Sequence, residues 1–281
     1  MTTLRFVKMH GCGNDFIMAE AFSGELPSDM AAVAVRLCDR HFGIGADGVI
    51  ALYPAEGYDF EMRLFQPDGS EAEMCGNGIR CAAVYALMCG ITAKRELAVK
   101  TGAGLIRPTV SEDGRLVRVD MGKPRLAAEQ IPCLLNNSGG DTVLEQPVTA
   151  AGREFAVSAV SMGNPHGVIF IDEPVADYPV AEYGPLLEVH RAFPAKANIE
   201  FAEVLDEKHI RVRVWERGVG ETLACGTGAC ATAVAAMLTG RAAEEVEVIL
   251  PGGTLQIGWR PGEAVFMTGP AACVFRGEVE L

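Results

Sequence analysis

The sequence predicts an α+β protein of two pseudo-symmetric homologous domains, each a mostly antiparallel β-sheet or barrel wrapped around a central α-helix. A repeat is the first observation behind this prediction, because Glu71–Ala83 returns in altered form as Glu221–Ala233. Cys75 and Cys225 hold the same place in the two copies, 150 positions apart (225 − 75). The second observation is that alternating, strand-like segments surround both copies. Two copies are too few for a repeat array and indicate a duplicated domain.

Other segments repeat at the same offset and in the same order. Gly13-Asn14 corresponds to Gly163-Asn164, and Thr101–Leu105 aligns with Pro251–Leu255. Several matches in one order at one spacing are hard to obtain by chance. The offset therefore supports homology along the whole of both halves.

Each half is expected to begin with a strand, at Leu4–His10 and at Glu154–Ser161, followed by the Gly-Asn turn. An alternating strand comes later in each half, at Phe60–Phe65 and at Ile210–Trp215. The period of two in these segments is typical of a half-buried strand. The halves therefore share one order of elements.

A polar turn then leads in each half to the cysteine and to a helix, which ends near Cys89 in the first half and near Leu238 in the second. Alanine-rich segments after two turn glycines favour a helix that starts at the turn. The last strands are expected at 97–100, 105–110 and 115–121 in the first half, and at 246–250, 254–259 and 264–268 in the second.

An additional amphipathic helix is expected at Ser28–His41, with Met30, Val33, Val35 and Leu37 on its apolar face. The residues 122–124 end the last strand of the first half and predict the domain boundary. We expect one domain to hold residues 1–122 and a C-terminal strand at about 270–281, and the other to hold residues 123–269.

Composition limits the possible functions. The net charge is −13 over 281 residues and no Lys/Arg cluster occurs, which argues against partners such as nucleic acid or an anionic membrane. The apolar stretches are too short to cross a membrane, and the start of the chain does not resemble a signal peptide. Nine cysteines, an odd number, favour free thiols and a cytoplasmic location over a disulfide framework.

The two repeated cysteines suggest a specific chemistry. Unpaired N–H groups and the dipole at a helix N-terminus favour an anion, so the thiol pKa of Cys75 and Cys225 is expected to fall toward working pH. One thiolate can then remove a proton from a carbon while the other thiol returns a proton to the opposite face, which inverts a stereocentre. Backbone donors at Gly76-Asn77 and Gly226-Thr227 could hold a substrate carboxylate. The sequence carries no dinucleotide-binding or phosphate-loop motif, and we expect neither cofactor nor metal.

Seven motifs follow one another along nearly the whole chain, in residues 8–16, 68–71, 74–81, 161–166, 197–201, 215–218 and 224–230. In these motifs the chain resembles the diaminopimelate epimerase family of cofactor-independent amino-acid epimerases. The resemblance implies the two-domain fold, Cys75 and Cys225 as acid and base, and a homodimer. It also implies an isomerase that converts LL-2,6-diaminopimelate to meso-diaminopimelate in lysine and peptidoglycan precursor synthesis.

The same resemblance implies roles for residues outside the two turns. Asn14, Asn164, Asn198 and Arg217 would hold the carboxylates and amino groups of the substrate, and an arginine fork suits a carboxylate. Two further residues, Glu216 and His166, would orient and tune the thiols, and Glu216 would also contact the substrate.

Three positions depart from the pattern of the family. Gln66 is expected to contact substrate but stands where many members carry Asn, and Pro67 beside it lacks a backbone donor. Gly48 replaces a substrate-contacting Gln of some members, and Phe275 lies near the place of a dimer-contact Tyr. The departures at Gln66 and Gly48 suggest an alternative substrate, such as histidine or lysine, for a racemase of this fold.

Simpler interpretations stay open from the residues alone. Cys75 and Cys225 could be inert core cysteines, or thiols of a redox sensor or metal binder that catalyses nothing. Asn14 and Asn164 could be turn formers beside glycine. His166 could equally be a scaffold residue.

Overall fold

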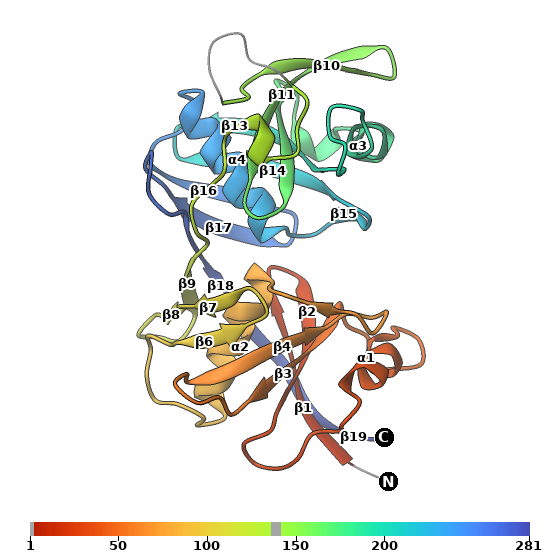
Figure 1. Cartoon of the computed structure of the whole chain (residues 1–281), viewed down its shortest axis with the longest axis vertical. Coiled ribbons are helices and arrows are strands. Elements are labelled where there is room, and N and C mark those ends of the chain that lie inside the picture. The colour runs from red at the N-terminus through yellow and green to blue at the C-terminus, as the bar shows by residue number, and fades with distance from the viewer. Residues whose placement is uncertain (1–2, 136–141) are drawn as a thin grey trace. The chain divides into compact units, whose positions relative to one another are not determined.

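The computed structural model describes residues 3–135 and 142–281, in two compact units (Figure 1). Unit 1 comprises the chain up to Asp120 together with Thr268–Leu281, and unit 2 comprises Met121–Met267. Residues 1–2 and 136–141, which fall within the predicted domains, lie outside the described residues. No helix in the described ranges combines the length and apolar character that crossing a membrane requires.

Unit 1 is built on one mixed β-sheet. Its strands are β1 (Thr3–Gly11), β2 (Asn14–Glu20), β3 (Gly48–Tyr53), β4 (Phe60–Phe65), β5 (Glu71–Ala72), β6 (Val99–Thr101), β7 (Gly104–Ile106) and β19 (Ala272–Glu280). They follow the order β19-β1-β2-β3-β4-β6-β7, and β5 pairs with β4. The pairs β2/β3 and β4/β6 are parallel and the other pairs are antiparallel. A hairpin of β8 (Thr109–Val110) and β9 (Leu116–Asp120) completes the strands that belong wholly to unit 1.

Unit 2 repeats this arrangement. Its strands are β10 (Gln146–Ala150), β11 (Arg153–Ser161), β12 (Pro165–Phe170), β13 (Asn198–Asp206), β14 (His209–Glu216), β15 (Gly220–Thr222), β16 (Glu245–Leu250) and β17 (Gly253–Gly258). They follow the order β10-β11-β12-β13-β14-β16-β17, and β15 pairs with β14. Again two pairs are parallel, β12/β13 and β14/β16. The shared topology confirms the predicted pseudo-symmetric fold.

Apart from the α-helices, the remaining elements in the described ranges are one strand and two short helices. The strand β18 (Phe266–Pro270) contains the point where the chain returns from unit 2 to unit 1. Two short 3₁₀ helices, η1 (Ala128–Gln130) and η2 (Val175–Asp177), lie in unit 2. The predicted strand at 105–110 was wrong as a single element, because β7 and β8 are separated by Arg107-Pro108 and proline cannot donate to a strand ladder.

One helix in each unit is enclosed by its strands. These are α2 (Gly76–Met88) and α4 (Gly226–Leu238), which correspond at the offset of 150 and are buried along most of their length. The helix α2 packs against β1, β2, β3 and β4, and α4 packs against β11, β12, β13 and β14. Small residues such as alanine, glycine and cysteine allow strands to approach on several sides. The predicted central helices are therefore confirmed.

The helix expected at Ser28–His41 is shorter, α1 (Met30–Cys38), and begins where Asp29 Oδ1 accepts a hydrogen bond from Ala32 N at 2.9 Å. Such a carboxylate cap satisfies one of the free N–H groups at the helix start. Val35 was wrongly placed on the apolar face: it is 50% exposed, and Ala34 is buried instead. The period of 3.6 residues explains this, because Val35 lies on the opposite side from Val33.

This helix is not an addition peculiar to the first half. Unit 2 contains α3 (Val180–Glu188) at the same offset, and the sequence reasoning missed it. Gly184 and Pro185 inside this helix lower its helix propensity. Packing requires the glycine, because a Cβ on Gly184 would lie 2.6 Å from Cγ of Trp215. Tertiary contact with β14 thus stabilises a helix that local propensity disfavours.

Candidate active site

Cys75 and Cys225 are the N-cap residues of α2 and α4. Cys75 Sγ accepts a hydrogen bond from Gly78 N at 3.4 Å, and Cys225 Sγ accepts one from Gly228 N at 3.3 Å. Serine, threonine or aspartate usually fills this position, so the sulfur takes the place of a capping oxygen. Each sulfur is therefore held at the electropositive end of a buried helix.

The second glycine of each Cys-Gly-x-Gly turn lies against a buried side chain of a neighbouring strand. A Cβ on Gly78 would lie 2.9 Å from Ile50 Cδ1, and a Cβ on Gly228 would lie 2.8 Å from Glu200 Oε1. Both distances are shorter than real Cβ contacts, so a side chain at either position would force the buried end of Ile50 or Glu200 to shift. The motif thus places the start of α2 close to β3 in unit 1 and the start of α4 close to β13 in unit 2.

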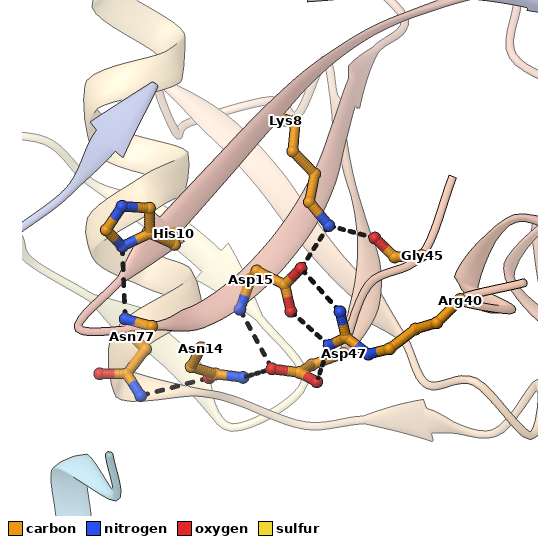
Figure 2. Close-up of polar contacts among 9 residues, drawn as sticks. Lys8, His10, Asn14, Asp15, Arg40, Gly45, Asp47 and Asn77 are labelled. Carbon is orange, nitrogen blue, oxygen red and sulfur yellow. Dashed lines mark hydrogen bonds and ion pairs between the residues drawn. The ribbon is translucent and has the colours of Figure 1, made fainter. Parts of the chain in front are cut away.

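In unit 1, Asn14 and Asn77 lie beside Cys75. Asn14 Oδ1 accepts a hydrogen bond from Asn77 Nδ2 at 3.2 Å and lies 3.6 Å from Cys75 Sγ, within reach of its S–H. Asn14 Nδ2 donates to Asp47 Oδ2 at 2.7 Å (Figure 2). These bonds fix which way the amide of Asn14 faces, so its oxygen is directed at the sulfur.

A charged network behind Asn14 holds it in place (Figure 2). Arg40 Nη2 donates to Asp47 Oδ1 at 2.7 Å and to Asp15 Oδ1 at 2.7 Å. Lys8 Nζ also pairs with Asp15 and donates to the carbonyl oxygen of Gly45. The network connects β1, β2 and the segment before β3. Sequence reasoning missed it because its members are spread over 40 positions.

The pH dependence of stability should report this network. Burial alone would raise the pKa of Asp15, but hydrogen bonds from Arg40 and Lys8 outweigh it and lower the pKa from 3.8 to about 2. Ionised Asp15 therefore stabilises the folded state by about 2 kcal/mol above pH 4, and this contribution is lost as pH falls through 2. Asp15→Asn should be less stable than wild type at pH 7, and urea unfolding should show the difference narrowing toward pH 2. A difference that stays constant with pH would contradict this assignment.

Arg80 is fully buried in the first turns of α2. Its Nη1 donates to Gly76 O at 3.0 Å, its Nη2 to Asn77 Oδ1 at 2.9 Å, and its Nε to Pro270 O at 3.1 Å. The guanidinium thus joins the turn after Cys75 to the returning C-terminal chain. The sequence reasoning missed this role, although an arginine within an alanine-rich helix is a signal that could have indicated it.

In unit 2, a series of hydrogen-bonded side chains leads away from Cys225. Cys225 Sγ lies 3.5 Å from Thr227 Oγ1, which accepts a hydrogen bond from Asn164 Nδ2 at 3.3 Å. Asn164 Oδ1 lies 3.0 Å from His166 Nε2. His166 is fully buried on β12, with its Nδ1 2.7 Å from Glu200 Oε1. The structure therefore brings the predicted Asn164, His166, Cys225 and Thr227 together.

Arg217 follows β14 in a turn that several groups hold. Asn198 Oδ1 accepts from Arg217 N at 2.9 Å, and Asn198 Nδ2 donates to Pro165 O at 3.1 Å. Glu188 at the end of α3 accepts from Gly218 N at 3.0 Å and from Trp215 Nε1 at 2.9 Å. Asn198, which is 3% exposed, thus places the turn of Arg217 next to the start of β12.

The expected fall in thiol pKa was wrong for Cys225. Burial, and then the charges of Glu216 and Glu200, raise the pKa of Cys225 well above 9.0. The hydrogen bonds from Thr227 and from the backbone N–H of Gly228 act in the opposite direction but are outweighed. A helix N-terminus lowers a thiol pKa, but loss of hydration and a facing carboxylate raise it and can outweigh the helix. Cys225 therefore rests as a thiol at neutral pH.

Comparison with known proteins identifies the family. A sequence profile described as diaminopimelate epimerase matches residues 6–127 and 158–274. The diaminopimelate epimerase of Desulforudis audaxviator is 54% identical over 98% of this chain and 99% of that protein. That of Moorella thermoacetica is 51% identical over 99% of this chain and 100% of that protein. The chain belongs to the diaminopimelate epimerase family. This confirms the resemblance seen in the sequence and the predicted isomerase class.

Solved structures share the fold of this family at low sequence identity. A hydroxyproline epimerase of Agrobacterium vitis, solved with trans-4-hydroxy-L-proline bound, is 16% identical and superimposes with a TM-score of 0.69. The match covers 99% of this chain and 92% of that one. The two-domain architecture therefore extends beyond the diaminopimelate epimerases.

The structure explains one departure from the family pattern. A Cβ on Gly48 would lie 2.9 Å from Leu64 Cδ1 and 3.0 Å from Phe65 O, so β4 leaves no room for a glutamine side chain there. Gln66 is exposed in the turn after β4, where its N–H donates to Ser70 O at 2.8 Å. Neighbouring packing, rather than a changed substrate, is enough to account for the glycine. Among the described residues, no group of three or more His, Cys, Asp or Glu side chains is placed to hold a metal ion.

Proposed function

We propose that this chain converts LL-2,6-diaminopimelate to meso-diaminopimelate by proton transfer between two thiols, without a cofactor. The supporting observation is that each unit presents the same arrangement: an N-cap cysteine, a glycine N–H bonded to its sulfur, and an asparagine at the offset of 150. The reaction needs an acid and a base on opposite faces of a carbon. A duplicated domain supplies two such groups from one ancestral turn.

In the proposed reaction, the thiolate of Cys75 or Cys225 removes the α-proton and the thiol of the other donates a proton to the opposite face. The cysteines exchange protonation states in each turnover, so the reverse reaction uses the same groups in exchanged roles. The raised pKa of Cys225 supports Cys225 as the proton donor in the free enzyme and Cys75 as the base. The substrate carboxylate would lie at the helix N-termini, where N–H groups stabilise charge on the deprotonated carbon.

We assign the remaining predicted residues to substrate binding. Arg217 would grip a carboxylate with its fork, and Asn198 would keep its turn in place. His166 and Glu216 would tune Cys225, since Glu216 already acts on its pKa. The other proposed contacts are Asn14, Gln66, Gly76, Asn77, Asn164, Gly226 and Thr227.

Deuterium incorporation at the α-carbon tests the substrate assignment. In deuterated water, LL-diaminopimelate should gain deuterium and convert to the meso form much faster than L-lysine or L-histidine exchanges. Faster exchange on histidine or lysine would instead establish a racemase of another amino acid. Exchange on none of them, with cysteines that respond only to oxidant or zinc, would support a thiol protein that catalyses nothing.

We further propose that the protein acts in the cytoplasm, in lysine and peptidoglycan precursor synthesis, and forms a homodimer. Free cysteines in all described parts of the chain suit a reducing compartment. Val274 and Phe275 are 57% and 46% exposed on β19, which is an edge strand of its sheet. An exposed apolar edge strand is a natural place for contact with a second copy.

A further inference from the structure

A buried polar contact in unit 2 lies at positions that apolar residues occupy in unit 1. His166 Nδ1 lies 2.7 Å from Glu200 Oε1, and both side chains are 0% exposed. The same register positions in unit 1 hold Phe16 and Ile50, because Phe16 pairs with Gly48 and Met18 with Ile50, as His166 pairs with Asn198 and Val168 with Glu200. Both apolar residues are also buried. The duplicated fold therefore does not need a polar pair at this place.

The surroundings of Glu200 favour its protonated form. Its Oε2 is buried and has no hydrogen-bond partner among the described residues. An ionised carboxylate with one bare oxygen in the interior is costly, whereas a neutral acid leaves only a carbonyl oxygen unpaired. Burial raises the pKa of Glu200, although the neighbouring His166 opposes this. A protonated Oε1 can donate its hydrogen bond to His166 Nδ1.

This donor sets the direction of every later hydrogen bond. If Nδ1 of His166 accepts, the ring proton lies on Nε2 and donates to Asn164 Oδ1 at 3.0 Å. Asn164 Nδ2 then donates to Thr227 Oγ1 at 3.3 Å, and the hydroxyl of Thr227 is left to donate toward Cys225 Sγ at 3.5 Å. Hydrogen bonds that run in one direction strengthen one another. The chain ends on the sulfur that must become a thiolate in one half of the reaction.

We propose that Glu200 is a positioning residue for Cys225: as a neutral acid it fixes the Nε2–H tautomer of His166, and through Asn164 and Thr227 it directs a hydrogen-bond donor at the thiolate. The proposal rests on the proposed function for the role of the thiolate. It moves no proton along the chain. Unit 1 lacks this device, so the two cysteines are stabilised as thiolates by different means.

The titratable groups that face Glu200 come from three elements. His166 on β12 lowers its pKa, and Glu216 on β14 raises it. Cys225, at the start of α4, interacts with the charges of both Glu200 and Glu216. A neutral Glu200 removes one of these two negative charges from beside the sulfur. Glu216 stays as the charge that opposes thiolate formation.

Three variants test the role of Glu200. Glu200→Gln keeps a donor for His166 Nδ1 and should retain kcat within about threefold. Glu200→Ile removes the donor and should lower kcat about 10- to 100-fold, the value of one hydrogen bond to a charged group. It should also move the limb of the pH profile that belongs to Cys225 to higher pH. Equal losses in both variants, or full activity of Glu200→Ile, would overturn the proposal.

The double variant His166→Phe/Glu200→Ile is the matched control, because it copies the pair that unit 1 carries. It should fold with a melting temperature close to that of wild type and be as slow as Glu200→Ile. Wild-type activity in this variant would show that the polar chain has no role. If the double variant does not fold, the comparison of Glu200→Gln with Glu200→Ile still tests the role of Glu200.

The tautomer of His166 can be measured by NMR in the free protein, without an activity assay. Among five histidines, the ring signals of His166 are those lost in a His166→Phe variant. Long-range ¹H–¹⁵N spectra should show a neutral ring that carries its proton on Nε2 in wild type and in Glu200→Gln. An imidazolium, or a ring protonated only on Nδ1, would overturn the proposal. Because these spectra do not depend on epimerisation, this failure is distinguishable from failure of the proposed function.

Discussion

Replacing either Cys75 or Cys225 by alanine should abolish the conversion of LL-diaminopimelate to meso-diaminopimelate, with a loss in kcat of about 10³-fold or more. Each variant removes one of the two groups that exchange a proton with the α-carbon. The N-terminus of α2 or α4 would remain to bind the substrate carboxylate, so KM should change much less than kcat. Inversion can be followed by circular dichroism or by chiral chromatography of the products.

Controls for this result come from the same two helices. Cys81→Ala and Cys230→Ala each remove a buried sulfur a few residues further along α2 or α4. Both variants should keep kcat within about threefold of wild type, because a change in core packing lowers the stability of the fold and leaves the reacting groups in place. Full turnover by Cys75→Ala or Cys225→Ala would end the two-base proposal. Equal losses in all four variants would point to damaged helices instead.

Arg80→Leu should destabilise unit 1 by about 3–5 kcal/mol. The change leaves two carbonyl oxygens, of Gly76 and Pro270, and the amide oxygen of Asn77 without the donor that the guanidinium supplies. Because Gly76 and Asn77 form the turn after Cys75, epimerase activity should fall together with stability. Hydrogen–deuterium exchange measured by mass spectrometry should show faster exchange in the peptides of α2.

Unit 2 provides the internal control for Arg80→Leu. Both tryptophans, Trp215 and Trp259, lie in unit 2, so tryptophan fluorescence during urea unfolding follows that unit. In Arg80→Leu, the rate of hydrogen–deuterium exchange in α4 should change less than the rate in α2. Arg80→Lys keeps the charge but loses the fork, and should fall between wild type and Arg80→Leu. Unchanged exchange in α2 would show that Arg80 is dispensable.

The sequence predicted much of the local structure because its signals are local. Two glycines after a cysteine, followed by alanine-rich residues, are enough to place a helix start at Gly76 and at Gly226. The period of two gave β4 and β14 to within two residues. The buried strands β3 and β13 show no such alternation, and they were not predicted. The helix α3 was missed because Gly184 and Pro185 lower its helix propensity, and only the contact with Trp215 explains the glycine.

Some properties of the site depend on residues that meet only in three dimensions. Nothing near Cys225 in the sequence shows that Glu200 lies against Gly228. The register of β13 in the sheet brings the Glu200 side chain to this position. Burial, and then the charge of Glu216, reverse the fall in thiol pKa that a helix N-terminus alone would give. The contacts of Arg80 with Pro270 likewise join residues 190 positions apart.

By itself, the sequence determined the duplication, the two capping cysteines, the central helices and the family, since each depends on order and spacing along the chain. The tertiary structure decided which asparagine oxygen faces which sulfur, why Gly48 can carry no side chain, and why one cysteine has a buried acid behind it while its counterpart has an isoleucine. These depend on distances across strands, and such distances are set by packing rather than by neighbours in the sequence.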